Sequence, residues 1–295
     1  METSVYTELL CNCEYLERKL KKKEMVKTNF QELLEAGVHF GHLKRKWNPN
    51  MAPYIFMEKN GIHILDLNKT MVKLDEAVNA ISQIAKSGKK ILFVATKKQA
   101  KDIVSESAKS VRMPYITERW SGGMLTNFPT IRKAVKKMST IDKMKTDGTF
   151  ENISKRERLQ IERQRLKLET VLGSISEMTK LPAALFVVDV SKEKIAVLEA
   201  KRLHIPVFGI VDTNSDPSIE FPIPANDDAS KSIQVIVNAV TSAIADGLSE
   251  RRANREMEAK AKEQKTSTEG GDKNVKRARK TTARKEDTKP ATEQK

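Results

Sequence analysis

The sequence predicts an α/β protein with a flavodoxin-like, doubly wound and mainly parallel sheet. Short apolar runs occur at residues 90–95, 184–188 and 207–211, and each is continuous, as expected of strands buried on both faces. Segments with helical spacing come after them, notably residues 193–203 and 228–246. Buried strands that alternate with helices indicate parallel strands joined by right-handed crossovers.

Three smaller elements are expected before the first buried strand. A short helix should begin near Asn29, where an N-cap residue precedes apolar positions. A β-hairpin should turn at Asn60-Gly61, because Asn-Gly between apolar runs favours a two-residue turn. A longer amphipathic helix should then end at Gly88. A further short strand is expected at residues 114–117.

Residues 117–131 join the predicted sheet to a different kind of segment. Arg119 and Trp120 precede the glycine pair Gly122-Gly123, and Phe128 opens the next helix. Paired glycines beside these residues are typical of a loop whose backbone lies close to another group. That group could be the protein's own core or a phosphate chain, and the residues alone leave both alternatives open.

Residues 131–180 are predicted to protrude as an antiparallel coiled-coil hairpin. Apolar residues recur every three or four positions from Ile131 on a strongly basic helix, and Gly148 marks a reversal. A second, highly charged helix returns over residues 154–173. The alternative is two ordinary helices packed flat on the sheet, but polar residues all round residues 155–167 favour projection.

The charge of the chain is concentrated in two places. It has 54 Lys and Arg against 39 Asp and Glu, a formal net charge of +15. Residues 251–295 hold 15 basic and 8 acidic residues, and residues 97–145 hold 12 and 4, so these segments carry +7 and +8. The rest of the chain therefore sums to zero. This distribution predicts a polyanionic partner, either nucleic acid or an anionic membrane surface.

Several classes of protein are excluded by what the sequence lacks. No apolar run approaches the roughly 20 residues needed to cross a bilayer. The two cysteines, Cys11 and Cys13, cannot form a disulfide framework and lack the second pair of a zinc site, which favours a reducing, cytosolic setting.

Composition divides the chain into five parts. Residues 1–24 do not fit the remainder of the chain and form a leader that is hypothesised to be untranslated, with translation starting at Met25. Residues 25–130 and 181–248 are the two parts of the α/β domain, and residues 131–180 are the hairpin inserted between them. Residues 249–295 are expected to be a basic tail that is disordered in isolation, because it has too few apolar residues to fold.

An enzyme acting on a phosphorylated ligand is the alternative that the fold class itself raises, since such sheets place chemistry at the carboxyl ends of their strands. Asp189 and Asp212 stand there and could form a carboxylate pair, or could cap the helix or turn after each strand. No glycine-rich phosphate loop and no nucleophile–base pattern is present, so no catalytic residue and no cofactor is predicted. His39 and His42 are spaced for a metal but have Gly41 between them and no nearby further ligand, so no metal is predicted.

Several motifs resemble the bacterial S-two family of small-subunit ribosomal proteins. They are LLEAGVHFG from residue 33, NGIHILDL from 60, FVATKKQA from 93, the segment 119–130, and IVDTN from 210. The resemblance covers about residues 30–247. It implies a flavodoxin-like domain with a protruding hairpin, located in the cytoplasm on the ribosome. It also implies binding to small-subunit rRNA on the back of the particle, at the head–body junction, and no catalytic role.

The same resemblance implies neighbouring ribosomal proteins as partners, and in some bacteria the large messenger-binding ribosomal protein. A coiled-coil adaptor with a protein partner is a third alternative. The residues expected to contact rRNA phosphates are Lys44, Arg45, Lys46, Lys97, Lys98, Lys101, Arg119, Arg132, Lys133, Lys136 and Lys137. The residues expected to anchor the loop are Trp120, Gly122, Gly123 and Phe128.

Overall fold

The computed structural model describes residues 29–148 and 154–283, and it describes side chains as far as residue 257. The predicted leader lies outside the described residues. Within the described part, no helix combines the length and apolar character that crossing a membrane requires.

The centre of the fold is a five-stranded sheet in which every neighbouring pair is parallel. Its strand order is β5-β4-β6-β7-β8. Counted along the chain within this sheet, that order is 2-1-3-4-5, which is the flavodoxin-like order. The predicted fold class is therefore confirmed. The strands are β4 (Ile91–Val94), β5 (Tyr115–Ile116), β6 (Ala184–Val188), β7 (Val207–Val211) and β8 (Phe221–Pro224).

Two apolar cores cover the two faces of this sheet. Alternate residues of a strand point to opposite faces, so Phe93 and Phe186 enter one core while Leu92 and Leu185 enter the other. The first core is closed by α3 (Leu67–Lys86), α4 (Lys98–Ser110) and the start of α8 (Ser230–Ala283). The second is closed by α7 (Lys194–Arg202), the loop around Trp120 and the 3-10 helix η4 (Gly173–Ile175).

A second, antiparallel sheet has the order β1-β3-β2. It contains β1 (Phe40–Leu43), β2 (Ile55–Lys59) and β3 (Ile62–Leu65), and it comes after α2 (Phe30–Glu35) in the chain. Asn60 and Gly61 have φ values of 52° and 74°, which are the left-handed values that a two-residue hairpin turn needs. The predicted hairpin is confirmed. Strand β1 was not predicted. Two short 3-10 helices, η1 (Lys44–Lys46) and η2 (Pro49–Tyr54), connect β1 to β2.

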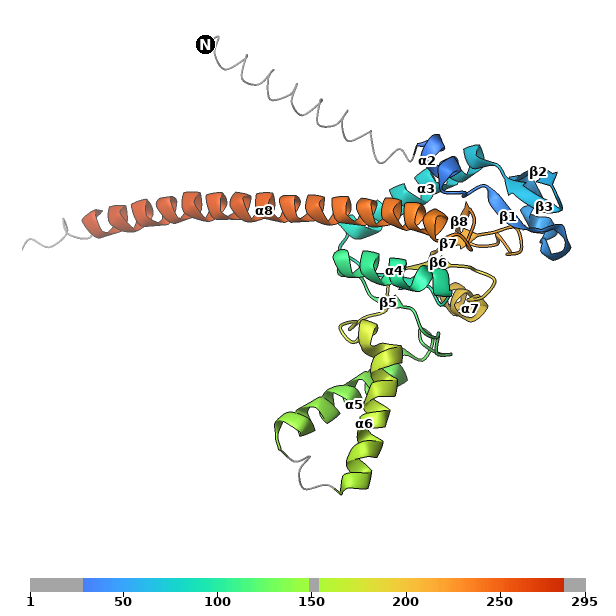
Figure 1. Ribbon diagram of the computed structural model, residues 1–295. Coiled ribbons are helices and arrows are strands. Elements are labelled where there is room, and N and C mark those ends of the chain that lie inside the picture. The colour runs from blue at the N-terminus through green and yellow to red at the C-terminus, as the bar shows by residue number, and fades with distance from the viewer. Residues whose placement is uncertain (1–28, 149–153, 284–295) are drawn as a thin grey trace, which may run out of the picture. The chain divides into compact units, whose positions relative to one another are not determined.

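The helices α5 (Phe128–Thr146) and α6 (Lys155–Leu172) form the predicted hairpin (Figure 1). Lys137 hydrogen-bonds Gln164 and Lys145 bonds Glu162, at 3.2 and 3.1 Å, so later residues of α5 meet earlier residues of α6. Each helix has only one buried residue. Two helices packed flat on the sheet would bury a full stripe, so that alternative does not fit.

Helix α8 continues through residue 249, where the sequence places the start of the tail. Its buried residues recur at helical spacing from Ile233 to Ile244 and pack on the sheet. The described residues up to 248 and those from 249 onward belong to two separate units. The disorder expected of the isolated tail stays a prediction.

Candidate functional site

A cluster of charged side chains lies at the carboxyl ends of the parallel strands. We call it the carboxyl-edge cluster: His42, Lys97, Asp189, Asp212, Asp227 and Asp228. Lys97 lies shortly after β4, and its Nζ is 2.8 Å from Asp227 Oδ1 and 2.7 Å from Asp228 Oδ1. Asp189 comes directly after β6 and lies 3.5 Å from the same ammonium. One lysine therefore neutralises carboxylates from two separate segments.

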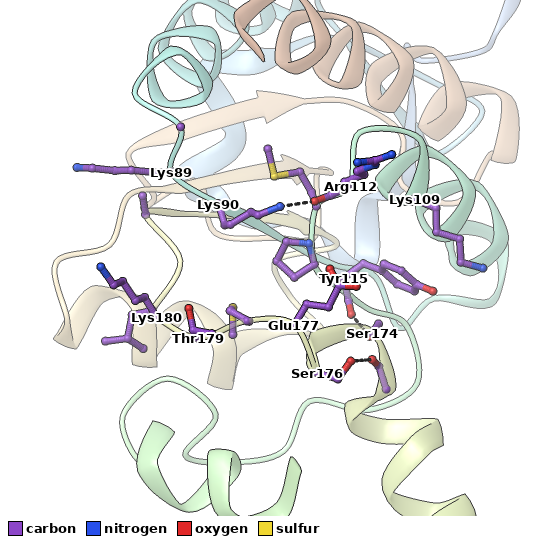
Figure 2. Close-up of a pocket in the computed structure, with 17 residues that line it drawn as sticks. Lys89, Lys90, Lys109, Arg112, Tyr115, Ser174, Ser176, Glu177, Thr179 and Lys180 are labelled. Carbon is purple, nitrogen blue, oxygen red and sulfur yellow. Dashed lines mark hydrogen bonds between the residues drawn. The ribbon is translucent and has the colours of Figure 1, made fainter. Parts of the chain in front are cut away.

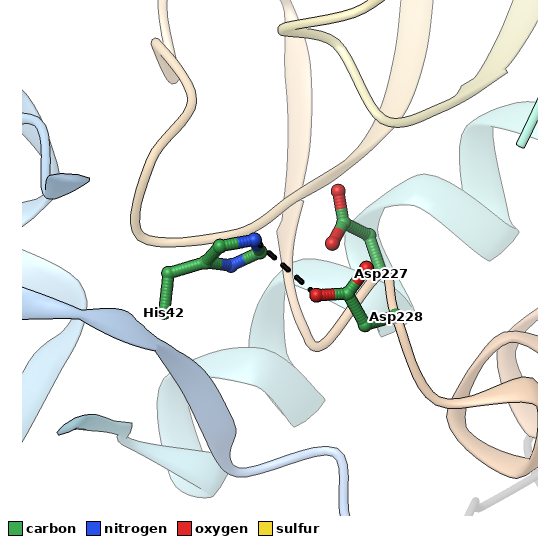
Figure 3. A group of neighbouring side chains, drawn as sticks. All are labelled: His42, Asp227 and Asp228. Carbon is green, nitrogen blue, oxygen red and sulfur yellow. Dashed lines mark ion pairs between the residues drawn. The ribbon is translucent and has the colours of Figure 1, made fainter.

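The histidine of this cluster comes from the small sheet. His42 Nδ1 lies 2.8 Å from Asp212 Oδ2. Its Nε2 lies 3.3 Å from Asp228 Oδ2 (Figure 3). The backbone N–H of His42 donates to Thr213 Oγ1 at 2.8 Å. This close approach requires Gly41, because a Cβ there would lie 2.6 Å from Thr213 Cγ2. The glycine between the two histidines thus serves contact between the sheets.

Burial and neighbouring charges both shift the pKa values in this cluster. Burial alone would lower the pKa of Lys97, but hydrogen bonds with Asp227 and Asp228 outweigh burial and raise it above its ordinary value. Burial, then repulsion from Asp212 and Asp189, raises the pKa of Asp227 to about 7, although Lys97 opposes this. The two pKa shifts differ because several carboxylates surround Lys97, whereas Asp227 has a single neighbouring cation, which also pairs with other carboxylates. The hydrogen bond to Asp212 raises the pKa of His42.

Lys97 and Asp189 of this cluster follow β4 and β6, between which the strand order reverses, and doubly wound proteins bind their ligands at the carboxyl ends of such strands. Lys97 has 13% of its side chain exposed and is surrounded by carboxylates, so it is poorly placed for the phosphate contact expected of it. Lys97 is therefore not among the RNA contacts proposed below. His42, Asp227 and Asp228 offer ligand atoms within 4.8 Å of one another, close enough for a metal ion. His39 is not among these three residues.

A different carboxylate organises the loop at residues 117–131. Glu199 of α7 is 6% exposed, and five donors lie within hydrogen-bond distance of its two oxygens. Its Oε1 accepts from Gly123 N at 2.7 Å and Trp120 Nε1 at 3.2 Å. Its Oε2 accepts from Leu125 N at 3.0 Å and from both N and Oγ1 of Thr126 at 3.2 Å. The loop therefore wraps around an anion, and that anion belongs to the protein itself.

These bonds hold the Glu199 carboxylate in its charged form. Burial would raise its pKa, but the backbone donors of Gly123, Leu125 and Thr126 and the Trp120 indole together lower it. The loop's core residues lie in the second apolar core, with Trp120 buried at 6% and Phe128 half-buried. The sequence left open whether the backbone of this loop approaches the protein's own core or a phosphate chain. In the structure it approaches the core.

The two glycines of the loop have different roles. Gly123 has φ of 83°, a left-handed value, and a Cβ there would lie 3.3 Å from Asn127 Cβ. Gly122 has no such φ, and a Cβ there would meet nothing within 4 Å. Only Gly123 is required by the backbone, so the predicted anchor role of Gly122 has no visible basis.

The predicted RNA contacts fall into two groups. Lys44, Arg45 and Lys46 are exposed at η1, where Lys44 pairs with Glu58 at 2.8 Å. The other group lies around the start of α4, in the loop at Arg119 and along α5. The ion pair of Lys101 with Glu118, at 2.9 Å, joins α4 to the loop that carries Arg119. Arg132 Nη1 donates to Thr179 O at 3.2 Å. The exposed members of this second group are Lys98, Arg119, Arg132, Lys133, Lys136 and Lys137.

Sequence reasoning did not identify Glu199, Asp227 or Asp228 as organising residues. Glu199 sits in an ordinary amphipathic helix, and its partners lie 73–79 positions away. A weak signal existed, because Glu199 occupies a position between the buried residues Ala196 and Ala200 on the apolar face of α7. The adjacent pair Asp227-Asp228, shortly before α8, was part of the family resemblance but carried no chemical role.

Comparison with known proteins agrees with the resemblance. The family model described as "Ribosomal protein S2" matches residues 33–247. The small ribosomal subunit protein uS2 of Phocaeicola vulgatus is 71% identical over 237 residues, which cover 80% of this chain and 85% of that protein. The uS2 protein of Flavobacterium johnsoniae is 67% identical over 234 residues, covering 79% and 92%. These relatives are ribosomal proteins, so the enzyme alternative is excluded. The chain belongs to the ribosomal protein S2 family.

Proposed function

We propose that this structural protein of the small ribosomal subunit binds small-subunit rRNA through exposed cations on α5 and the adjoining loop. The proposed contacts are the exposed residues Arg119, Lys133 and Lys136, together with Lys98 at the start of α4. We further propose that the protein sits at the head–body junction on the back of the particle, among neighbouring small-subunit proteins. The large messenger-binding ribosomal protein is a further proposed partner.

The observation that supports this proposal is that these cations are exposed and have no carboxylate partner among the described side chains. Arg119, Lys133 and Lys136 are exposed, and within residues 29–148 and 154–257 no ion pair neutralises them. Lys97, by contrast, is already neutralised inside the carboxyl-edge cluster. Exposed, unneutralised cations are available to displace the counterions of RNA phosphates, which is the main source of affinity in such interfaces. Phosphate contacts of this kind fix position without reading base sequence.

The test compares two triple variants of the full chain. The first replaces Arg119, Lys133 and Lys136 with glutamate. The control replaces Lys59, Lys194 and Lys231 with glutamate, at positions that are exposed but lie outside this surface. Both sets change the net charge by the same amount, so any general loss of attraction to RNA is matched. Tagged copies are expressed beside the wild type, and the share that enters small subunits is measured after gradient sedimentation.

We expect the first variant to stay in the free pool while the control enters subunits. Thermal unfolding followed by circular dichroism should be alike for both. Incorporation of the first variant at the level of the control would overturn the proposed surface.

A further inference from the structure

A cleft of about 900 Å³ opens at the opposite edge of the main sheet, where the strands begin (Figure 2). Its walls come from the segments that lead into β4, β5 and β6, together with η4. These strands are parallel and adjacent, so their starting ends meet at one edge although the segments lie far apart in the sequence. We call this the amino-edge cleft.

The lining of the amino-edge cleft is strongly basic. Its charged residues are Lys89, Lys90, Lys109, Arg112 and Lys180, against the single carboxylate of Glu177. All five cations are exposed, and no ion pair with a carboxylate is found for them within the described side chains. Like charges gathered in one concave surface repel one another, and an anionic ligand would relieve that repulsion.

One of these cations is bonded to the backbone, and another stands at an unusual backbone conformation. Lys90 Nζ donates to the carbonyl oxygen of Arg112 at 2.6 Å, which leaves two of its three N–H donors for a ligand. Arg112 has φ of 53°, a left-handed conformation in which glycine would be unstrained. This conformation occurs directly after α4 and its cap, and it leaves an arginine side chain at the cleft.

The cations are spread along the cleft instead of converging on one point. In Figure 2, Lys89 and Lys180 lie at one end, Lys90 and Arg112 lie in the middle, and Lys109 lies beyond them next to Tyr115. Lys109 Nζ is 5.8 Å from the centre of the Tyr115 ring. A single phosphate would need convergent donors, whereas a spread of this kind fits successive phosphates of a nucleic-acid backbone.

The cleft also adjoins the surface proposed above. Arg132 of α5 donates to the carbonyl oxygen of Thr179, and Thr179 lines the cleft beside Lys180. We infer that the amino-edge cleft is a second rRNA site, which binds a run of backbone phosphates next to those bound by α5. This inference rests on the proposed function and adds a second surface to it.

The test uses neutral substitutions that spare the structural bond of Lys90. The cleft variant combines Lys89→Gln, Arg112→Gly and Lys180→Gln, and the glycine suits the left-handed position, so folding should be preserved. The control variant is Lys59→Gln, Lys194→Gln and Lys231→Gln. Full-length proteins are titrated against a small-subunit rRNA transcript at several salt concentrations, beside the wild type and the α5 charge-reversal variant.

We expect the cleft variant to bind the transcript roughly 10- to 100-fold more weakly than the control at physiological salt. Its slope of log affinity against log salt should be shallower by about 2, since each lost phosphate contact removes roughly 0.7–0.9. A cleft variant with the affinity and slope of the control would overturn the inference, while weak binding of the α5 variant would still support the proposed function. Normal binding of the transcript with failed entry into subunits would instead indicate a protein at the cleft, and would also overturn it.

Discussion

Replacing Glu199 with glutamine keeps the size of the side chain that holds the loop but removes one of its two accepting oxygens. The amide oxygen can serve Leu125 and Thr126, which together supply three of the five donors. The amide NH₂ then faces the indole N–H of Trp120 and the backbone N–H of Gly123, neither of which can accept.

The expected loss follows from those two stranded donors. A buried donor without a partner costs about 1–3 kcal/mol. Gly123 is only partly buried, so the pair should cost about 2–4 kcal/mol of the free energy of unfolding. At roughly 2–4 °C per kcal/mol for a folded unit of this size, the melting temperature should fall by about 5–15 °C.

The assay is urea unfolding of Glu199→Gln beside Glu106→Gln, which changes an exposed glutamate on α4 in the same way. The control should stay within about 0.5 kcal/mol of the wild type. The lowered pKa of Glu199 adds a second readout. Its stabilising contribution is present above the ordinary pKa and is lost as the pH falls through the lowered one, so the gap between variant and wild type should narrow in acid. A loss below about 1 kcal/mol at neutral pH, the lower end of the cost of one stranded donor, would refute the role of Glu199.

Two further predictions concern the same loop and the carboxyl-edge cluster. Gly123→Ala should destabilise the protein by about 1–2 kcal/mol in urea unfolding because it forces a left-handed alanine, whereas Gly122→Ala should be neutral; equal effects would mean that the loop backbone is described wrongly. Because burial and neighbouring aspartates raise the pKa of Asp227 to about 7, its charge should reduce stability as the pH rises from about 4 to 7. Asp227→Asn should therefore nearly match the wild type at or below about pH 4 and exceed it near pH 8, and a constant difference between the two unfolding curves would contradict this.

Strands β4, β6 and β7 were predicted from their continuous apolar runs. Strands β6 and β7 have the predicted bounds, because their residues are buried on both faces and no polar residue interrupts them. Strand β8 was missed because it reads Phe-Pro-Ile-Pro, and proline cannot donate to a sheet. It is tolerated since β8 lies at the edge of the sheet, where one side needs no partner.

The sites were harder to predict because their residues meet only after folding. Lys97 stands in a basic stretch, and nothing near it in sequence reveals that the distant residues Asp227 and Asp228 neutralise it. At the amino-edge cleft, by contrast, counting charge along the chain misses cations that do gather in space. Lys89, Lys90 and Lys180 fall outside the block at residues 97–145, yet the parallel sheet brings them to the cations of that block.

The cations of the folded unit are unevenly neutralised, and this has a consequence for how the protein meets a large polyanion. The aspartates where the strands end are paired with Lys97 and His42, whereas the lysines and the arginine of the amino-edge cleft have no carboxylate partner among the described side chains. The positive potential is therefore strongest over the cations that lack such a partner. In the field of RNA this unevenness exerts a torque before any contact forms and turns those cations toward the phosphates. Encounters would thus begin in a restricted set of orientations, which shortens the search for the bound pose most strongly at low salt.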